Sequence, residues 1–233
     1  MNHQVVILAG GLATRLGKLV SEIPKSLVNI NGIPFIIHQL NYLKSQGLKN
    51  VHLCLGHKGD LIIDILSKNP ELMMNITYSF DGNKQLGTGG AIVNALSYLK
   101  EEFFLQYGDV YLPVEYIEIY NFYKANKNAN IMAVYKNENK HDKSNIIFNK
   151  KKITLYDKKL DDPKMNYIDY GLAFLKKKSF MEYQVDNFLD LSDIYKLLIK
   201  KDKMIGFEVF KRFYEIGKLE GIRDTEKYLK FNI

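Results

Sequence analysis

The sequence predicts an α/β fold, in which helices sandwich a mostly parallel mixed sheet and the second half adds a small antiparallel lobe. Two patterns support this prediction. In the first half, apolar strand-like runs alternate with stretches of helical period, which is typical of parallel strands joined by crossover helices. In the second half, strand-like runs follow one another closely. The 233 residues are 46% hydrophobic, which suits a folded globular chain.

The first half contains apolar runs bounded by glycine, each followed by a segment with helical spacing. Ile36, Leu40 and Leu43 recur at helical spacing, and Gly47 suits a C-cap. "VNINGIPF" predicts an Asn-Gly hairpin ahead of the second strand. Strands are predicted at 4–9, 50–56, 74–80 and 102–108, and helices at 33–47, 60–69 and 89–100.

The second half reads as five strands and two helices. The strands are short, rich in β-branched and aromatic residues, and separated by lysine-rich turns. Strands are predicted at 130–136, 144–148, 151–157, 166–176 and 206–211, and helices at 190–201 and 224–231.

Composition limits the function classes. The net charge of +7 indicates anionic partners, yet arginine occurs only at positions 15, 212 and 223, so phosphorylated small molecules are favoured over nucleic acid. Neither a signal peptide nor a membrane-spanning run is found, which predicts no membrane association. The single Cys54 lies in an apolar strand, which predicts an inert core thiol and a reducing cytoplasmic location.

The stretch "VVILAGGLATRLGK" (5–18) is a buried strand that breaks into a glycine turn. Its spacing matches neither the P-loop nor the dinucleotide fingerprint. Gly10 and Gly11 allow a sharp turn that presents N–H groups to phosphate, while Thr14 and Arg15 add a hydroxyl and a planar cation. The alternative is an ordinary strand-to-helix turn with an exposed arginine. The sequence of the turn by itself does not decide between phosphate binding and an ordinary turn.

The next segment, "EIPKSL", places Lys25 after a rigid proline, from where it can return to the same phosphates. The whole stretch resembles the signature of sugar-1-phosphate nucleotidylyltransferases, L-x-G-G-x-G-T-R-L followed by P-K-P-L. Ala13 and Ser26 depart from that signature, and neither change removes a charge. The resemblance implies a Rossmann-like nucleotidyltransferase fold and the reaction of an NTP with a sugar 1-phosphate.

Further segments resemble later family motifs, in the family's order. They are "QLGTGGAIVNAL" (85–96), "LQYGDV" (105–110), "LYDKK" (155–159), "YIDYGLAFL" (167–175) and "RFYEIGKLEG" (212–221). Each also has an ordinary structural explanation, such as a helix start, a strand-end turn or a solvated lysine. The last motif carries Glu215 where the family usually has aspartate.

The resemblance implies a role for each matching residue. Catalysis is assigned to Arg15, Lys25 and Asp109, and Mg²⁺ to Asp109 and Glu215. Nucleotide binding is assigned to Leu8, Ala9, Gly10, Gly11, Thr14, Arg15, Lys25, Gln85, Gly87 and Thr88. Sugar-phosphate binding is assigned to Gly108, Asp109, Lys158, Asp169, Tyr170 and Gly171.

The expected organisation is one domain over 1–233, with a nucleotide-binding half to about residue 125 and a sugar-phosphate-binding half after it. The chain most resembles short bacterial enzymes that activate sugars for surface polysaccharides, especially guanylyltransferases that act on heptose 1-phosphates. GTP with a heptose or hexose 1-phosphate is therefore expected. CTP, dTTP or UTP, another phosphorylated acceptor, and a non-catalytic nucleotide-binding regulatory subunit stay open as alternatives, as does a homo-oligomer.

Overall fold

The computed structural model describes residues 2–11, 23–82, 84–127, 129–184 and 188–232. The chain divides into two compact units. The first comprises residues 1–85, 106–111 and 213–233, and the second comprises 86–105 and 112–212. The expectation of one domain with halves meeting near residue 125 stays a prediction.

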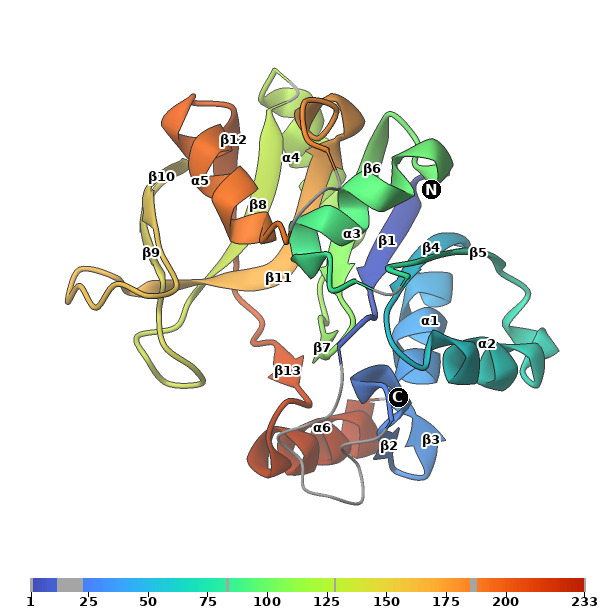
Figure 1. Ribbon diagram of the computed structural model, residues 1–233. Helices are drawn as coiled ribbons and strands as arrows, with labels where there is room; N and C mark the ends of the chain where they lie inside the picture. The colour runs from blue at the N-terminus through green and yellow to red at the C-terminus, as the bar shows by residue number, and fades with distance from the viewer. Residues whose placement is uncertain (1, 12–22, 83, 128, 185–187, 233) are drawn as a thin grey trace. The chain divides into compact units, whose positions relative to one another are not determined.

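The first unit is built on parallel strands (Figure 1). β1 (Gln4–Leu8) pairs with β4 (Asn50–Leu55), which pairs with β5 (Asn75–Phe80). The connecting helices are α1 (Phe35–Ser45) and α2 (Gly59–Ser67), with short 3-10 turns η2 (Lys25–Leu27) and η3 (Pro70–Leu72). α1 ends as predicted, because Gly47 has φ +73° and Leu48 N–H returns to Leu43 O at 2.9 Å.

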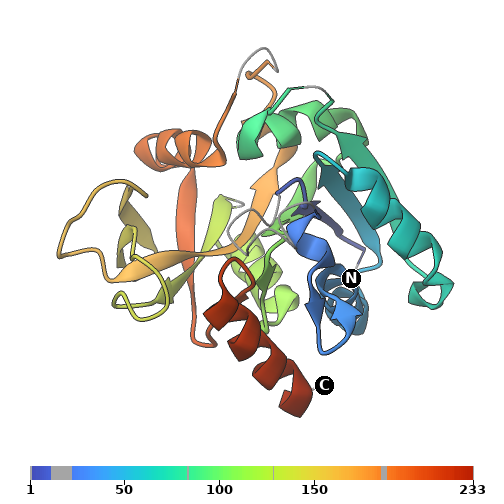
Figure 2. The same cartoon turned by 60° about the horizontal axis from the view of Figure 1, so that its bottom comes forward.

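Four two-residue strands and the C-terminal helix complete the first unit. β2 (Asn29–Ile30) and β3 (Ile33–Pro34) form the predicted hairpin, with positive φ at Asn31 and Gly32. β7 (Val110–Tyr111) pairs with β13 (Tyr214–Glu215), and α6 (Leu219–Asn232) follows. Figure 2 shows α6 beside the hairpin, and a buried cluster joins them: Val28, Ile30, Phe35, Tyr111, Ile216 and Leu229. This cluster fixes the C-terminal segment to the unit.

The second unit mixes parallel and antiparallel pairs. β11 (Tyr167–Lys176) pairs antiparallel with β8 (Asn130–Lys136) and β9 (Ile146–Asn149), β9 with β10 (Lys152–Tyr156), and β8 parallel with β12 (Met204–Val209). β6 (Glu102–Tyr107) crosses from this unit to the first at Gln106. The helices are α3 (Gly87–Ala95), α4 (Tyr116–Ala125) and α5 (Leu191–Lys200), with turns η4 (Leu96–Tyr98) and η5 (Lys177–Ser179).

The structure confirms the predicted fold class and the predicted strands and helices, with small shifts at their ends. α4 and the two-residue strands β7 and β13 were not predicted. Cys54 is buried, which raises the pKa of its thiol to about 12 and fits a core role. Among the described residues, no helix is both long enough and apolar enough to span a bilayer.

Candidate functional site

The glycine turn after β1 depends on a close approach of two backbones. A β-carbon on Gly10 would lie 3.1 Å from Gly56 N, and one on Gly56 would lie 2.6 Å from Gly10 O. Leu8 ends the strand, and Ala9 N–H donates to Cys54 O at 2.9 Å. Glycine is therefore required by packing at this turn, beyond any role with phosphate. Thr14 and Arg15 lie outside the described residues.

Lys25 returns to this turn, as its spacing suggested. Its backbone N–H donates to Gly11 O at 3.0 Å, and its Nζ lies 3.0 Å from Asp109 Oδ2. The side chains of Lys25 and Asp109 are 22% and 33% exposed, so the pair faces solvent from a partly enclosed position. Two residues 84 positions apart in the chain are thus held together beside the glycine turn.

Asp109 owes its place to the residues before it. Gly108 N–H donates to Leu8 O at 3.0 Å, and a β-carbon on Gly108 would lie 2.6 Å from that oxygen. Gln39, buried in α1, donates its Nε2 to Tyr107 O at 3.1 Å and to Val110 O at 2.8 Å. One amide therefore holds the backbone on both sides of Asp109.

Glu215 is brought to the same place by the β7–β13 pair. Glu215 lies opposite Val110, and Ile216 N–H donates to Asp109 O at 3.0 Å. A β-carbon on Gly217 would lie 3.9 Å from both Glu215 Oε2 and Lys25 Nζ. Lys25, Asp109 and Glu215 thus face one small space, which the absence of a side chain on Gly217 leaves free.

These carboxylates fit a divalent cation of the magnesium type. Mg²⁺ is commonly held by one or two carboxylates, with substrate phosphates and water completing its oxygen shell. The described residues contain no cluster of three or more His, Cys, Asp or Glu side chains that could hold a metal by themselves. Asp109 and Glu215 supply two partly exposed oxygen donors, which suits a metal that arrives with a nucleotide.

Gln39 gives the first testable prediction. Replacing Gln39 with Met keeps the shape of the side chain but leaves the carbonyls of Tyr107 and Val110 without their donor. We expect a loss of about 2–4 kcal/mol in unfolding free energy and a lower kcat, because each buried unpaired group costs about 1–3 kcal/mol. Denaturant unfolding and steady-state kinetics measure both effects. Gln46→Met, at the end of the same helix, is the control; equal behaviour of the two variants would contradict this role.

Asp81 was not predicted from the sequence, although it directly follows β5 as Asp109 follows β6. Its Oδ2 would lie 3.7 Å from a β-carbon on Gly10, and its N–H donates to Leu55 O at 2.9 Å. Burial raises the pKa of its carboxyl to about 6. An acid beside the glycine turn suits a ligand group that donates hydrogen bonds. Gln85, also in this unit, is exposed.

The second unit gathers Lys158, Asp169 and Gly171. Asp169 Oδ1 accepts from Gly171 N–H at 3.0 Å, and Oδ2 accepts from the Tyr156 hydroxyl at 3.2 Å. Burial raises the pKa of the Asp169 carboxyl, while the positive charge of Lys158 opposes that rise. Gly171 has φ +84°, a backbone conformation that a residue with a side chain adopts only with strain. It lies where the pairing register of β11 and β8 shifts. A lysine, a carboxylate and a glycine with positive φ therefore lie together.

Tyr170 and the first turn of α3 (residues 87–90) have internal partners. Tyr170 is 1% exposed, and its hydroxyl donates to Arg212 O at 3.4 Å. Thr88 Oγ1 accepts from Leu191 N–H at 2.9 Å. A β-carbon on Gly87 would lie 2.5 Å from Leu189 O, an oxygen that also accepts two backbone N–H groups of this turn. Packing alone accounts for these glycines, and the ligand roles stay predictions.

Comparison with known proteins identifies the family. Residues 5–160, two thirds of the chain, match the model of the MobA-like NTP transferase domain. The chain belongs to the MobA-like NTP transferase family. This MobA-like protein is therefore a nucleotidyltransferase that uses an NTP. The matched range includes the glycine turn, Lys25, Asp109 and Lys158.

Full-length relatives support the assignment. This MobA-like transferase is 28% identical over 92% of its length to the D-glycero-alpha-D-manno-heptose 1-phosphate guanylyltransferase of Campylobacter jejuni, covering 94% of that protein. HddC from Yersinia pseudotuberculosis complexed with GMP-PN superposes with a TM-score of 0.77 at 26% identity, with 97% and 99% of the two chains covered. The inositol-1-phosphate CTP transferase of T. maritima, at 17% identity, shares the fold with a TM-score of 0.82, with 100% and 98% covered.

Proposed function

We propose that this transferase uses GTP and a heptose or hexose 1-phosphate to form a GDP-sugar and pyrophosphate for surface polysaccharide synthesis, in the cytoplasm. The observation that carries the proposal is the convergence of Lys25, Asp109 and Glu215 beside the glycine turn. A cation and two carboxylates beside the turn that follows the parallel strand β1 suit a nucleotide and its metal.

In the proposed reaction, an oxygen of the sugar phosphate forms a bond to the α-phosphorus of GTP. The bond from the α-phosphorus to the bridging oxygen breaks, and pyrophosphate leaves with the electron pair. Positioning and charge stabilisation supply the catalysis, so no covalent protein intermediate is needed. Lys25 neutralises charge that grows on the α-phosphate, and Arg15 binds the departing phosphates. Mg²⁺, held by Asp109 and Glu215, supplies Lewis-acid stabilisation when bound.

The acceptor is proposed to bind at Lys158, Asp169 and Gly171. Lys158 is exposed, and its charge acts on Asp169. Asp169 is held by Gly171 N–H and the Tyr156 hydroxyl, which pre-organises it to accept from sugar hydroxyls. Tyr170, buried beside it, anchors the strand.

Two observations support GTP as the nucleotide. The Campylobacter relative is named a guanylyltransferase, and the Yersinia structure contains GMP-PN. Asp81 adds a chemical reason, because a carboxylate accepts hydrogen bonds and guanine offers two adjacent donors, its ring N1–H and its 2-amino group. Asp81 lies beside Gly10, next to the proposed phosphate cradle.

Asp81 therefore predicts a pH dependence of GTP binding. The pKa of Asp81 is raised to about 6, so the accepting carboxylate is lost as pH falls through 6. At pH 5 about a tenth is ionised, so GTP should bind about tenfold more weakly than at pH 7.5. Calorimetric titration of GTP into wild type and into Asp81→Asn at both pH values checks this. The protonation of GTP itself also changes with pH, but that change affects both proteins equally, so only wild type should show the additional weakening. Parallel pH profiles for the two proteins would remove Asp81 from base recognition.

The proposed reaction is tested by a substrate matrix. Each of GTP, CTP, dTTP, UTP and ATP is mixed with heptose, mannose and glucose 1-phosphates and Mg²⁺, and pyrophosphate release is recorded. We expect the largest kcat/KM with GTP and a heptose or mannose 1-phosphate. A preference for CTP, dTTP or UTP would replace the base assignment alone. Nucleotide binding without pyrophosphate release in any mixture would favour the regulatory-subunit alternative.

A further inference from the structure

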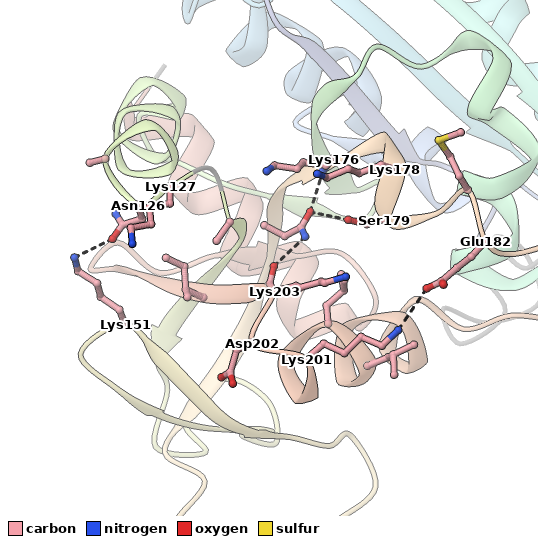
Figure 3. A pocket seen from close by; sticks show the side chains of 17 residues that line it. Asn126, Lys127, Lys151, Lys176, Lys178, Ser179, Glu182, Lys201, Asp202 and Lys203 are labelled. Carbon is pink, nitrogen blue, oxygen red and sulfur yellow. Dashed lines mark hydrogen bonds and ion pairs between the residues drawn. The ribbon is translucent and has the colours of Figure 1, made fainter.

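A large cavity lies wholly within the second unit and shares none of its lining with Lys158, Asp169 or Gly171 (Figure 3). Its volume is about 1000 Å³, at the upper end of the range for small-molecule sites. Four parts of the unit line it: the turn after α4, the β9–β10 turn, the end of β11 with η5, and the end of α5 leading into β12. The proposed reaction does not use this cavity.

The cavity carries an excess of positive charge. Six lysines line it: Lys127, Lys151, Lys176, Lys178, Lys201 and Lys203. Its two acids, Glu182 and Asp202, are already paired, the first with Lys201 at 3.8 Å and the second with Lys152, outside the lining, at 3.6 Å. Over the described residues, no salt bridge involves Lys127, Lys176, Lys178 or Lys203. An anionic ligand would supply the missing countercharge.

A buried asparagine organises these lysine-bearing segments. Asn130 is 4% exposed; its Oδ1 accepts from Lys176 N–H at 2.9 Å and from the Ser179 hydroxyl at 3.2 Å, and its Nδ2 donates to Lys203 O at 2.9 Å. Figure 3 draws these bonds as dashed lines that reach Lys176, Ser179 and Lys203. One side chain thus ties the end of β11 and η5 to the turn before β12. The backbone that carries the lysines is fixed before any ligand binds.

Two further features distinguish this cavity from a solvated lysine surface. Burial lowers the pKa of Lys176, and the charge of Lys178 lowers it further, while the negative charge of Glu102 opposes that fall. Leu197, Leu198 and Ile205 give the cavity apolar walls, which suit a sugar or base ring. Among the described residues, the lining contains neither arginine nor an aromatic ring for stacking, both of which are typical of nucleic-acid surfaces.

We propose that this cavity binds a small molecule carrying a diphosphate, at a second site separate from the reaction centre. A diphosphate matches several lysines at once and fits the volume together with a ring. In the proposed reaction both products carry this group, as free pyrophosphate or within the nucleotide sugar. Free pyrophosphate has no ring, whereas the nucleotide sugar would place a ring against the apolar walls.

The test is calorimetric titration of inorganic pyrophosphate, GDP and GDP-mannose into Lys178→Gln/Lys203→Gln. Both lysines are exposed and make no described side-chain contact, so the fold should persist, which thermal unfolding checks. The control, Lys124→Gln/Lys164→Gln, removes the same charge from exposed positions outside the cavity. A third protein, Lys25→Met, removes one positive charge from the reaction centre and none from the cavity.

We expect two binding events for pyrophosphate in wild type. One of them should weaken by about tenfold or more in the variant Lys178→Gln/Lys203→Gln. The same event should persist in the control variant Lys124→Gln/Lys164→Gln and in Lys25→Met. Tighter binding of GDP-mannose than of pyrophosphate at this event would identify the nucleotide sugar as the source. Equal weakening in both lysine pairs, or a single event lost in Lys25→Met, would overturn the second site. None of these titrations needs turnover, so the result stands apart from the test of nucleotidyl transfer.

Discussion

Asp109→Asn should lower kcat by about two or more orders of magnitude while leaving the fold intact, since the two side chains are nearly isosteric. The variant loses the charge that pairs with Lys25 at 3.0 Å and the strongest candidate for a metal ligand. Steady-state kinetics at saturating Mg²⁺ and thermal unfolding measure the two effects separately.

The matched control for this change is Asp64→Asn. Asp64 is exposed on α2 and pairs only with Lys68, so its loss should leave kcat within about twofold. Glu215→Asp is a useful companion, because it restores the aspartate typical of the resembled motif and should retain activity that Glu215→Gln loses. Turnover near the wild-type value in Asp109→Asn would remove Asp109 from the mechanism.

Lys25→Met should lower kcat by about 10²–10³-fold with a smaller change in the KM for GTP. The positive charge of Lys25 acts on charge that grows as the transition state forms, and removal of one such donor typically costs this much. Single-turnover rates with GTP in excess isolate the chemical step from product release.

Two control variants separate charge from packing at this position. Lys25→Arg keeps the charge and should recover part of the rate. Lys218→Met removes an exposed lysine that lies 3.8 Å from Glu215 in the same region, and it should have a small effect. If Lys25→Met and Lys218→Met show similar rates, Lys25 is only a member of a solvated ion pair.

Local patterns predicted most of the fold, because hydrophobic period and turn chemistry act over a few residues. The Asn-Gly hairpin and the Gly47 cap are examples, and both have the expected positive φ. α4 was missed because its apolar positions are tyrosine-rich and mixed with polar residues. β7 and β13 were missed because each has two residues and its partner lies about a hundred positions away.

The candidate site was less predictable from local pattern. The glycine turn follows a strand end, which gave a physical reason to select it, whereas Asp109, Glu215 and Lys158 were selected through resemblance. Gln39 carries no local signal, because its role depends on backbone 68 and 71 residues away. Asp81 did carry one, as an acid directly after a predicted strand. The lysine cavity was not predicted, because its residues are spread from 125 to 205.

The central claim, that this chain transfers a nucleotidyl group to a sugar phosphate, is tested most directly by ³¹P NMR of GTP, mannose or heptose 1-phosphate, Mg²⁺ and the protein. This one spectrum follows every phosphorus atom in the mixture. We predict that sugar 1-phosphate and GTP signals disappear together, while a new diphosphate pair and pyrophosphate appear in equal amounts. Orthophosphate release without a new diphosphate pair, or no change in any signal while GTP is bound, would contradict the account.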